Sequence, residues 1–275
     1  MIQDIGQKVF NNAFAKARDP LLNDEVFVFK DRDVLSSADG KTAKVSLPEA
    51  SLFEKDKLQF LFLIDEKAYF LYTGDPLSVR VDGFSYYPVQ IFRSDNDRVT
   101  CFAGFCAFHL YSWYKVNRYC GQCGSLLEHS KSERALVCSK CGNIIYPKIA
   151  PAVIVGVTDG DKIVVTRYKD RPYRGLALIA GFCEFGETPE QTAVREVFEE
   201  TGLKIKDLEY FGSQPWGMDS NLLIGYFAKI DGDRTIKMDE SELSEALWVN
   251  REQLESQGST ISLTKTMINH FKKNA

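Results

Sequence analysis

The feature of this sequence that most limits its fold is a set of four cysteines arranged as two Cys-x-x-Cys pairs. The pattern is Cys120-x2-Cys123-x14-Cys138-x2-Cys141. Each pair forms a tight turn that directs two thiolates at one point, and the intervening segment is long enough for a hairpin that returns the second pair to the first. We therefore expect a zinc ribbon, in which Cys120, Cys123, Cys138 and Cys141 bind one structural Zn²⁺.

Other interpretations of the cysteine region are less favoured. A catalytic zinc ion needs an open coordination position, which four thiolate ligands do not leave. Unmetallated or redox-active thiols are the remaining alternative. Residues 115–148 carry six basic and two acidic side chains, a local net charge of +4 in a chain of net charge −4. A nucleic-acid contact is compatible with this excess, although a solvated surface is the simpler interpretation.

The composition is typical of a folded protein without membrane-spanning segments. The chain has 275 residues, of which 44% are hydrophobic and 26% charged. These values exclude a disordered or fibrous protein, and the net charge gives no strong overall attraction to nucleic acid or to an anionic membrane. The longest apolar runs have the length of strands, and no secretory leader is visible. With the paired cysteines, this predicts a cytoplasmic protein without a membrane partner.

The sequence has three regions that differ in composition and in the pattern of apolar residues, and we expect each to be a domain. The expected fold class is α+β. Residues 1–115 are rich in aromatic residues and short strand-like runs, and predict a mostly-β N-terminal domain that ends in a helix over 103–116. Residues 116–147 are the ribbon, and residues 148–275 alternate strands and helices. In this last region we expect strands at 152–158, 162–168, 208–213 and 222–230, and a helix after Ser262.

The segment 181–203 predicts a helix with an acidic face. Thr188 is a suitable N-cap, Pro189 suits the first helical position, and Gly202 suits the C-terminal end. Residues three and four apart share one face of a helix. Three carboxylates meet this condition, and an arginine stands four residues before one of them: Glu196, Glu199, Glu200 and Arg195.

Three carboxylates on one face repel one another unless a cation lies among them. Oxygen ligands clustered in this way suit Mg²⁺ or Mn²⁺. The alternative is a solvated acidic helix face. The spacing argues against that alternative, because segment 181–203 matches the Nudix box G-x5-E-x7-R-E-U-x-E-E-x-G-U, with U apolar, at every defined position. The chain therefore resembles the Nudix hydrolases, whose fold is an α/β/α sandwich around a mixed sheet.

The order of a zinc ribbon followed by a Nudix domain resembles the NADH pyrophosphatase branch of that family. The segment Cys141–Pro151 leads from the ribbon into the first strand, and Ser213-Gln214-Pro215-Trp216 follows the box by about ten residues. Both stretches are similar to that branch. The resemblance implies metal-dependent hydrolysis of the pyrophosphate of NAD(H), which yields NMN(H) and AMP.

The resemblance also implies roles for individual residues. Catalytic roles fall to Glu199, Glu200 and Arg195, with Glu199 a ligand or the base. The divalent cation would be bound by Glu196, Glu200 and the carbonyl of Ala180, together with a later carboxylate. Glu242 matches the family position for that carboxylate, and Glu240 and Glu245 are its close competitors. The dinucleotide would lie against Tyr146, Phe182, Gln214, Pro215, Trp216 and Asn221.

The sequence departs from the family just after Trp216. The family carries S-Q-P-W-P-F-P-x-S there, whereas this chain has Gly217, Met218 and Asp219 in place of Pro-Phe-Pro, and Asn221 at the final Ser. We expect this loop to hold the dinucleotide less tightly. A Nudix hydrolase of another nucleoside diphosphate derivative, such as ADP-ribose or a dinucleotide polyphosphate, is therefore an alternative. A non-catalytic nucleotide-sensing or RNA-binding module is a third possibility, which the intact box carboxylates disfavour.

Family members also remove NAD caps from RNA 5′ ends and tend to form homodimers, so both are expectations here. The histidines His109, His129 and His270 receive no catalytic role. The three remaining cysteines are expected to be small buried apolar residues: Cys101, Cys106 and Cys183.

Overall fold

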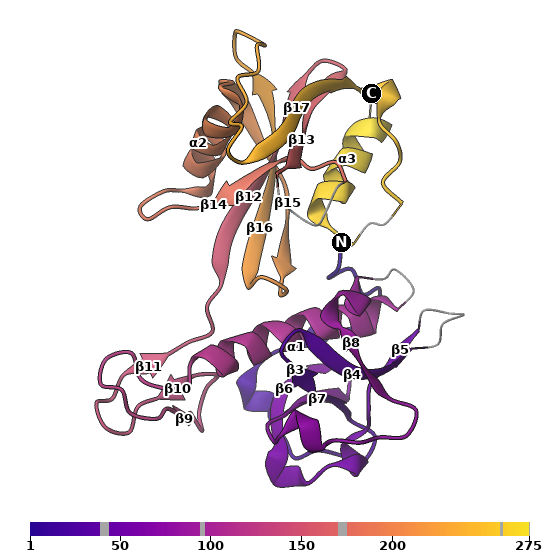
Figure 1. The fold of residues 1–275 in the computed structure, drawn as a ribbon, viewed down its shortest axis with the longest axis vertical. Helices are drawn as coiled ribbons and strands as arrows, with labels where there is room; N and C mark the ends of the chain where they lie inside the picture. Colours follow the sequence, from indigo (N-terminus) through magenta and orange to yellow (C-terminus); the bar gives the residue numbers. More distant parts are fainter. Residues whose placement is uncertain (39–43, 94–96, 170–174, 259–260, 275) are drawn as a thin grey trace. The chain divides into compact units, whose positions relative to one another are not determined.

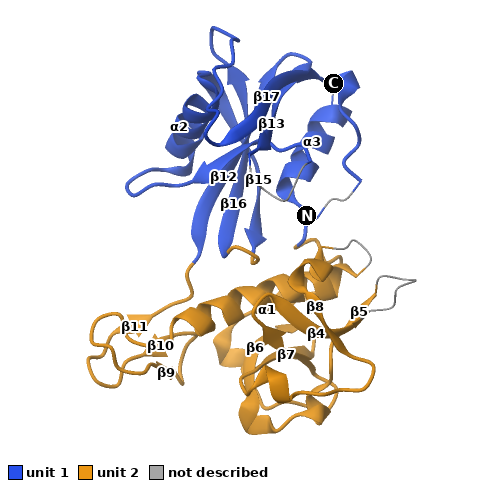
Figure 2. Cartoon of the chain, in the orientation of Figure 1, with its two compact units in different colours: residues 1–2, 149–216, 220–275 blue, residues 3–148, 217–219 orange. Residues whose placement is uncertain are grey.

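The structure, a computed structural model, describes residues 1–38, 44–93, 97–169, 175–258 and 261–274. The chain divides into two units, which Figure 2 shows in different colours. The first unit consists of residues 1–2, 149–216 and 220–275, and the second of residues 3–148 and 217–219. Among the described residues, no helix combines the length and the apolar character needed to cross a bilayer.

A mixed sheet forms the centre of the first unit (Figure 1). Its described strands number six, in the order β15-β16-β12-β13-β17, with β14 paired to β12. β12 and β16 are parallel, and the other pairs are antiparallel. The strands are β12 Ala150–Asp159, β13 Lys162–Tyr168, β14 Ile179–Phe182, β15 Ile205–Trp216, β16 Asn221–Ile230 and β17 Leu243–Asn250, and the helices are α2 Pro189–Thr201 and α3 Leu263–Lys273.

The two helices cover opposite faces of this sheet, as Figure 1 shows. Successive side chains of a strand point to opposite faces, so β12 contributes to two cores. Val153 packs with Ala193 and Val197 of α2. Its neighbour Ile154 packs with Met267 of α3. This arrangement confirms the expected α/β/α sandwich with a mixed sheet.

The four strands expected in this unit are present, and two further strands were missed. β14 has only four residues, and two of them are Ala180 and Gly181, which have low strand propensity. β17 has no clear alternation of polar and apolar residues. β15 extends to Trp216 through Pro215, which is tolerated because β15 lies at the edge of the sheet.

The second unit begins with a mostly-β region, as expected. One sheet has the order β1-β6-β7-β2, and another has the order β3-β4-β5 with β8 paired to β4. The described strands are β1 Phe10–Asn11, β2 Glu25–Phe27, β3 Phe29–Lys30, β4 Asp33–Ala38, β5 Val45–Ser46, β6 Leu58–Ile64, β7 Lys67–Tyr72 and β8 Ser85–Pro88.

A long helix and a small sheet complete the second unit. α1 (Arg98–Val116) begins five residues earlier than expected, because the Asp97 side chain caps it by accepting a hydrogen bond from the Thr100 N–H. Three short antiparallel strands then form the ribbon, in the order β11-β10-β9. They are β9 Glu128–His129, β10 Leu136–Val137 and β11 Ile144–Ile145.

Candidate metal and catalytic sites

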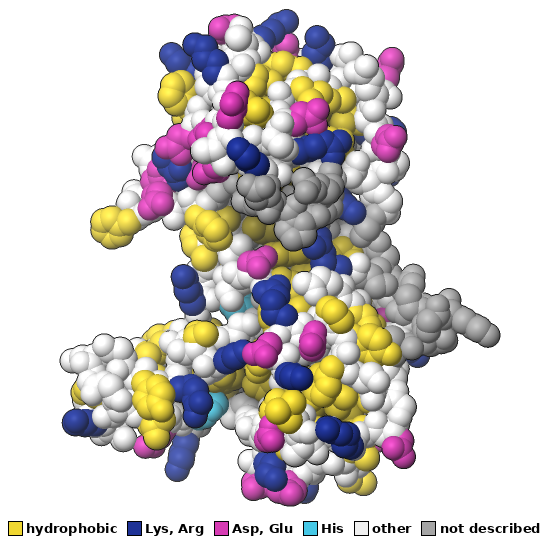
Figure 3. Space-filling model, viewed as in Figure 1, with side chains coloured by type: hydrophobic (Ala, Val, Ile, Leu, Met, Phe, Trp, Pro, Cys, Tyr) yellow, Lys and Arg dark blue, Asp and Glu magenta, His cyan; other side chains and the backbone are white. Residues whose placement is uncertain are grey.

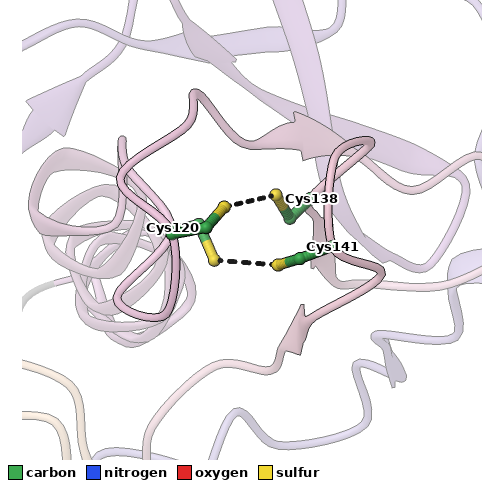
Figure 4. Close-up of side chains that lie close together, drawn as sticks. Cys120, Cys138 and Cys141 are labelled. Atoms are coloured by element: carbon green, nitrogen blue, oxygen red, sulfur yellow. Dashed lines mark hydrogen bonds between the residues drawn. The ribbon is translucent and has the colours of Figure 1, made fainter.

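The four cysteines of the ribbon lie together. Their sulfur atoms are all within 4.8 Å of one another. Cys120 Sγ lies 3.6 Å from Cys141 Sγ, and Cys123 Sγ lies 3.5 Å from Cys138 Sγ. Figure 4 shows the thiols from the two turns facing each other across a small space. The two Cys-x-x-Cys pairs therefore form one cluster in the fold, as their spacing in the sequence predicts.

The dimensions of this cluster fit a tetrahedral zinc ion. Four sulfurs at about 2.3 Å from a central Zn²⁺ would be separated from each other by about 3.8 Å, close to the separations found here. The thiols of the cluster do not ionise with equal ease. Burial opposes ionisation of Cys120, but hydrogen bonds from the Gln122 and Cys123 N–H groups, Cys141 and Asn143 together lower the pKa of its thiol to about 6. The Asn143 N–H favours a thiolate at Cys141, but burial and the other three cysteines raise the pKa of that thiol to about 12.

The second site is built on α2, whose ends are fixed as the sequence predicts. Thr188 Oγ1 accepts a hydrogen bond from the Gln191 N–H, and the Gln191 side chain accepts one from the Thr188 N–H, which forms a capping box. Gly202 ends the helix with φ of 69°. These two ends fix the rotation of the acidic face, over which acidic side chains gather in Figure 3.

Arg195 organises the carboxylates around it. Its guanidinium donates to Glu187 Oε1 at 2.6 Å and to Glu187 Oε2 at 2.9 Å, and also to Glu196 at 2.7 Å and Glu199 at 2.8 Å. A further bond of 3.0 Å reaches the Phe182 carbonyl oxygen in β14. One planar group thus holds the loop, the helix and the strand in register. The ion pair of Arg195 with Glu199 joins residues four apart on one face of α2.

Glu187 is held as an anion by this network. Arg195, and then the Glu184 N–H, lower the pKa of the Glu187 carboxyl to about 2. Thr192 Oγ1 also donates to Glu187 Oε2, at 2.9 Å. Glu187 therefore connects the loop before α2 to the helix. Both of its carboxylate oxygens accept hydrogen bonds from side chains of α2.

Glu200 differs from Glu187 in its surroundings. Its side chain is 2% exposed. Burial, and then the negative charges of Glu196 and Glu242, raise the pKa of the Glu200 carboxyl to about 8. Oε1 lies 3.4 Å from the Tyr168 hydroxyl, whereas the buried Oε2 has no hydrogen-bond partner among the residues that the structure describes. A buried, unpartnered carboxylate oxygen is expensive unless a cation or a proton is supplied.

Glu196 lies between the helix and β14. Burial raises the pKa of its carboxyl, and the ion pair with Arg195 partly offsets this. A Cβ atom at position 181 would fall 1.9 Å from Glu196 Cδ, so only glycine at position 181 leaves room for this carboxylate. The glycine of the box is thus required by the approach of Glu196 to the strand.

Of the three candidates for the later carboxylate, only Glu242 acts on the helix. Its charge raises the pKa of both Glu196 and Glu200. Glu245 is occupied by an ion pair with Arg167 at 2.7 Å. The Glu240 backbone carbonyl accepts a hydrogen bond from the Lys169 ammonium at 3.2 Å.

The residues of this second site fit a divalent cation in their chemistry but are not drawn tightly together. Within the described part of the chain, the four cysteines are the only set of His, Cys, Asp or Glu ligand atoms packed as closely as 4.8 Å. The reason is that Arg195 pulls Glu196 and Glu199 to its own guanidinium. The orphaned Glu200 Oε2 and the raised pKa values nevertheless mark a place where positive charge is missing.

The residues predicted to contact a dinucleotide fall into different environments. Phe182 is 53% exposed at the end of β14, and Pro215 is exposed on β15, whereas Trp216 is half-buried. Tyr146 lies in the second unit, is 56% exposed and donates to Glu133 Oε1 at 3.2 Å. These four side chains remain predicted contacts.

Gln214 and Asn221 are more constrained. Gln214 is 0% exposed, and its amide donates to the Ile261 carbonyl and accepts from the Leu263 N–H, both at 2.6 Å. Gln214 therefore forms hydrogen bonds with the backbone at the start of α3, and its buried side chain is not accessible to a nucleotide. Asn221 has a buried Oδ1 atom that no donor in the described part of the chain reaches.

The turn that departs from the family pattern is closely packed. A Cβ atom at Gly217 would lie 1.9 Å from the Phe105 carbonyl oxygen and 3.3 Å from His109 Cβ. Met218 is 7% exposed. Gly217 thus lies where α1 leaves no room for a side chain, and Met218 is buried. That this turn holds the dinucleotide less tightly stays a prediction.

One residue near the carboxylates was missed by sequence reasoning. The Tyr168 hydroxyl lies 3.2 Å from the Ala180 carbonyl oxygen as well as 3.4 Å from Glu200 Oε1. In the sequence, Tyr168 is only the last residue of an expected strand. No motif marks it, because its position depends on how β13 and β14 pass α2.

Comparisons with known proteins agree with this geometry. The family model of the NUDIX domain matches residues 148–269, and the model of the NADH pyrophosphatase zinc ribbon domain matches residues 116–146. A Nudix hydrolase structure from Nitrosomonas europaea has a TM-score of 0.50 and 22% identity, and the match covers 56% of this chain and 90% of that one. It shows the shared fold.

Two curated relatives illustrate the extent of the similarity. The NAD-capped RNA hydrolase NudC of Pseudomonas aeruginosa (strain LESB58) is 33% identical over 209 residues, which are 75% of this chain and 73% of the relative. The protein of the same name from Haemophilus influenzae (strain PittGG) is 39% identical over 156 residues, which are 53% of this chain and 59% of the relative. The chain thus covers somewhat more than half of the latter relative.

Proposed function

We propose that this chain, which belongs to the Nudix hydrolase family and carries a zinc ribbon of the NADH pyrophosphatase type, hydrolyses the pyrophosphate bond of NAD(H) to NMN(H) and AMP. One observation above all supports a hydrolytic site on α2. No described group donates to the buried Glu200 Oε2, and burial together with the neighbouring carboxylates raises the pKa of Glu200. That arrangement stabilises a bound cation and is otherwise unfavourable.

The cation site would be formed by Glu196 and Glu200 of α2, the Ala180 carbonyl of β14 and Glu242. These are oxygen ligands, which suit Mg²⁺ or Mn²⁺. When bound, such an ion would neutralise the charge of a pyrophosphate and lower the pKa of a water molecule. The pyrophosphate itself is a poor electrophile because its negative charge repels a nucleophile.

The surrounding residues hold this set in place. Arg195 restrains Glu196 and Glu199, and its bond to the Phe182 carbonyl connects the helix to β14. Glu199 is half-exposed at 56% of its side chain and can act as base or as a further ligand. Phe182 presents an exposed ring at the end of the ligand strand, which could stack on a nicotinamide or adenine ring.

The four-cysteine cluster would bind a structural Zn²⁺, because its sulfur separations match a tetrahedral site and leave no open position. We also propose NAD-capped RNA as a substrate. Two observations support this: the relatives with that printed name, and the local excess of basic residues in the ribbon. A homodimer is expected from the family resemblance, and light scattering of the purified protein tests it.

A second candidate function is hydrolysis of another nucleoside diphosphate derivative, such as ADP-ribose. The packed Gly217 and Met218 support it, because the aromatic that the family places in this segment is replaced by a methionine whose side chain is buried. The two candidates share the carboxylates of α2 and differ in the groups that bind the rest of the substrate.

A substrate panel tests the proposal. NADH, NAD⁺, ADP-ribose and an NAD-capped RNA are incubated with Mg²⁺ or Mn²⁺, and the products are separated by chromatography. We expect NMNH and AMP from NADH only when a divalent cation is present. Cleavage of ADP-ribose alone would favour the second candidate, and turnover of none of the four compounds would contradict both.

A further inference from the structure

A tyrosine lies between two elements that carry proposed cation ligands. Tyr168 is the last residue of β13 and is 9% exposed. Its hydroxyl lies 3.2 Å from the Ala180 carbonyl oxygen in β14 and 3.4 Å from Glu200 Oε1 in α2. A single hydroxyl is thus within hydrogen-bond reach of two proposed ligands that are twenty residues apart in the sequence.

The strand is irregular at this point. The register of β13 on β17 shifts between Arg167 and Tyr168, as it does at a β-bulge. Bulges commonly redirect a side chain beside a functional site. The next residue, Lys169, donates its backbone N–H to the Glu242 carbonyl oxygen at 2.8 Å. The end of β13 and the residue after it therefore contact the backbone carbonyls of Ala180 and Glu242 and the side chain of Glu200, which are three of the four residues that we propose as ligands.

We infer that Tyr168 is a positioning residue of the divalent-cation site, whose hydroxyl fixes the Ala180 carbonyl relative to the Glu200 carboxylate. The inference rests on the cation site proposed above. The hydroxyl has one hydrogen, which the two acceptors share. A carbonyl or carboxylate oxygen has two lone pairs, so either oxygen can accept from Tyr168 and still bind a cation. Tyr168 engages only Oε1 of Glu200, and Oε2 is left for the cation.

The chain contains a matched control for this tyrosine. Tyr226 is also buried, at 5% exposure, and its hydroxyl donates to Glu190 Oε1 of α2 at 2.8 Å. Glu190 is not among the proposed ligands. Tyr226→Phe therefore removes a tyrosine–glutamate bond to the same helix without touching the site.

The test measures Mn²⁺ binding in the absence of substrate, by the electron paramagnetic resonance signal of free Mn²⁺. The proteins are the wild type, Tyr168→Phe, Tyr226→Phe and Glu200→Gln, each with its zinc retained. Groups that orient metal ligands typically change metal affinity by about 10- to 100-fold. We expect the Kd of Tyr168→Phe to rise roughly 10-fold or more, and that of Tyr226→Phe to stay at the wild-type value.

Activity provides a second, independent readout. The Mn²⁺ concentration for half-maximal NADH hydrolysis should rise in Tyr168→Phe and stay at the wild-type value in Tyr226→Phe. A merely structural tyrosine would lower the unfolding temperature and leave the Mn²⁺ affinity of the folded protein unchanged. A wild-type Kd in Tyr168→Phe overturns the inference. Equal Kd values for the wild type and Glu200→Gln would instead overturn the proposed cation site.

Discussion

Gly181 and Glu196 are so close that a Cβ atom at position 181 would lie 1.9 Å from Glu196 Cδ. The atoms it would meet belong to the end of a long side chain, which can move aside. A side chain at 181 is therefore compatible with folding, but it displaces the carboxylate that we propose as a cation ligand.

The corresponding prediction concerns Gly181→Ala. A displacement of about 1 Å in a catalytic group can lower the rate by about 100-fold, so we expect kcat/KM for NADH to fall by roughly that factor with little change in the unfolding temperature. Gly212→Ala is the control, because a Cβ atom there meets only Met1 Cε at 3.7 Å. Wild-type kinetics for Gly181→Ala would show that Glu196 need not lie where the structure places it.

A second prediction concerns stability without Mg²⁺ or Mn²⁺. The pKa of Glu200 is about 8 in the fold, above that of an unfolded glutamate. The Glu200 carboxyl therefore makes its full contribution to the free energy of unfolding at a pH below about 4. That contribution is lost as the pH rises toward 8. Glutamine at position 200 cannot ionise, so Glu200→Gln should be more stable than the wild type at pH 9, by about 1 kcal/mol or more.

Urea unfolding at pH 5 and pH 9 measures this effect. The difference between the two proteins should be small at pH 5, where Glu200 is protonated, and large at pH 9. Addition of Mn²⁺ should stabilise the wild type more than Glu200→Gln. If the free energy of unfolding changes equally with pH in both proteins, Glu200 is not a buried carboxyl with a raised pKa.

A third prediction concerns the four-cysteine cluster. Cys138→Ser should lose the bound zinc and unfold the ribbon, because zinc binding at such sites contributes about 10 kcal/mol or more to folding of small zinc domains. Elemental analysis should give one zinc per wild-type chain. Cys183→Ser is the control. Cys183 lies outside the cluster, so the protein with this substitution should retain the zinc. Zinc content well below half an ion per wild-type chain would argue against the ribbon site.

A fourth prediction concerns Gly217. A Cβ atom there would meet the backbone oxygen of Phe105, which cannot move as a side-chain end can. Gly217→Ala should therefore destabilise the protein by about 1–3 kcal/mol, as overpacked substitutions do. Thermal unfolding checks it against Gly212→Ala. An unchanged midpoint would mean that this turn does not pack against α1 as described.

The sequence was sufficient where local rules decide the structure. The spacing of Cys120, Cys123, Cys138 and Cys141 predicted one cluster, because two short turns leave little choice of geometry. The caps at Thr188 and Gly202 predicted α2 and hence which residues share its face. Both predictions depend on contacts between residues close in the chain.

The sequence was insufficient where the site depends on distant strands. Tyr168 approaches Glu200 only because β13 bulges at its end and passes beside α2. Gln214 was expected to face a nucleotide, but it binds the backbone at Ile261 and Leu263, forty or more residues later. Pairings of this kind carry no local signal, so a motif can mark the segment without telling which side chains face the ligand.

The central claim is that the carboxylates of α2 support cation-dependent hydrolysis of a pyrophosphate. The most direct test compares kcat for the conversion of NADH to NMNH and AMP in the wild type and in Glu200→Gln, at saturating Mn²⁺. Loss of a cation ligand removes charge neutralisation and water activation together, so we predict a decrease on the order of 10³-fold, which is about 4 kcal/mol of transition-state stabilisation. Turnover of Glu200→Gln close to the wild-type value would contradict the assignment.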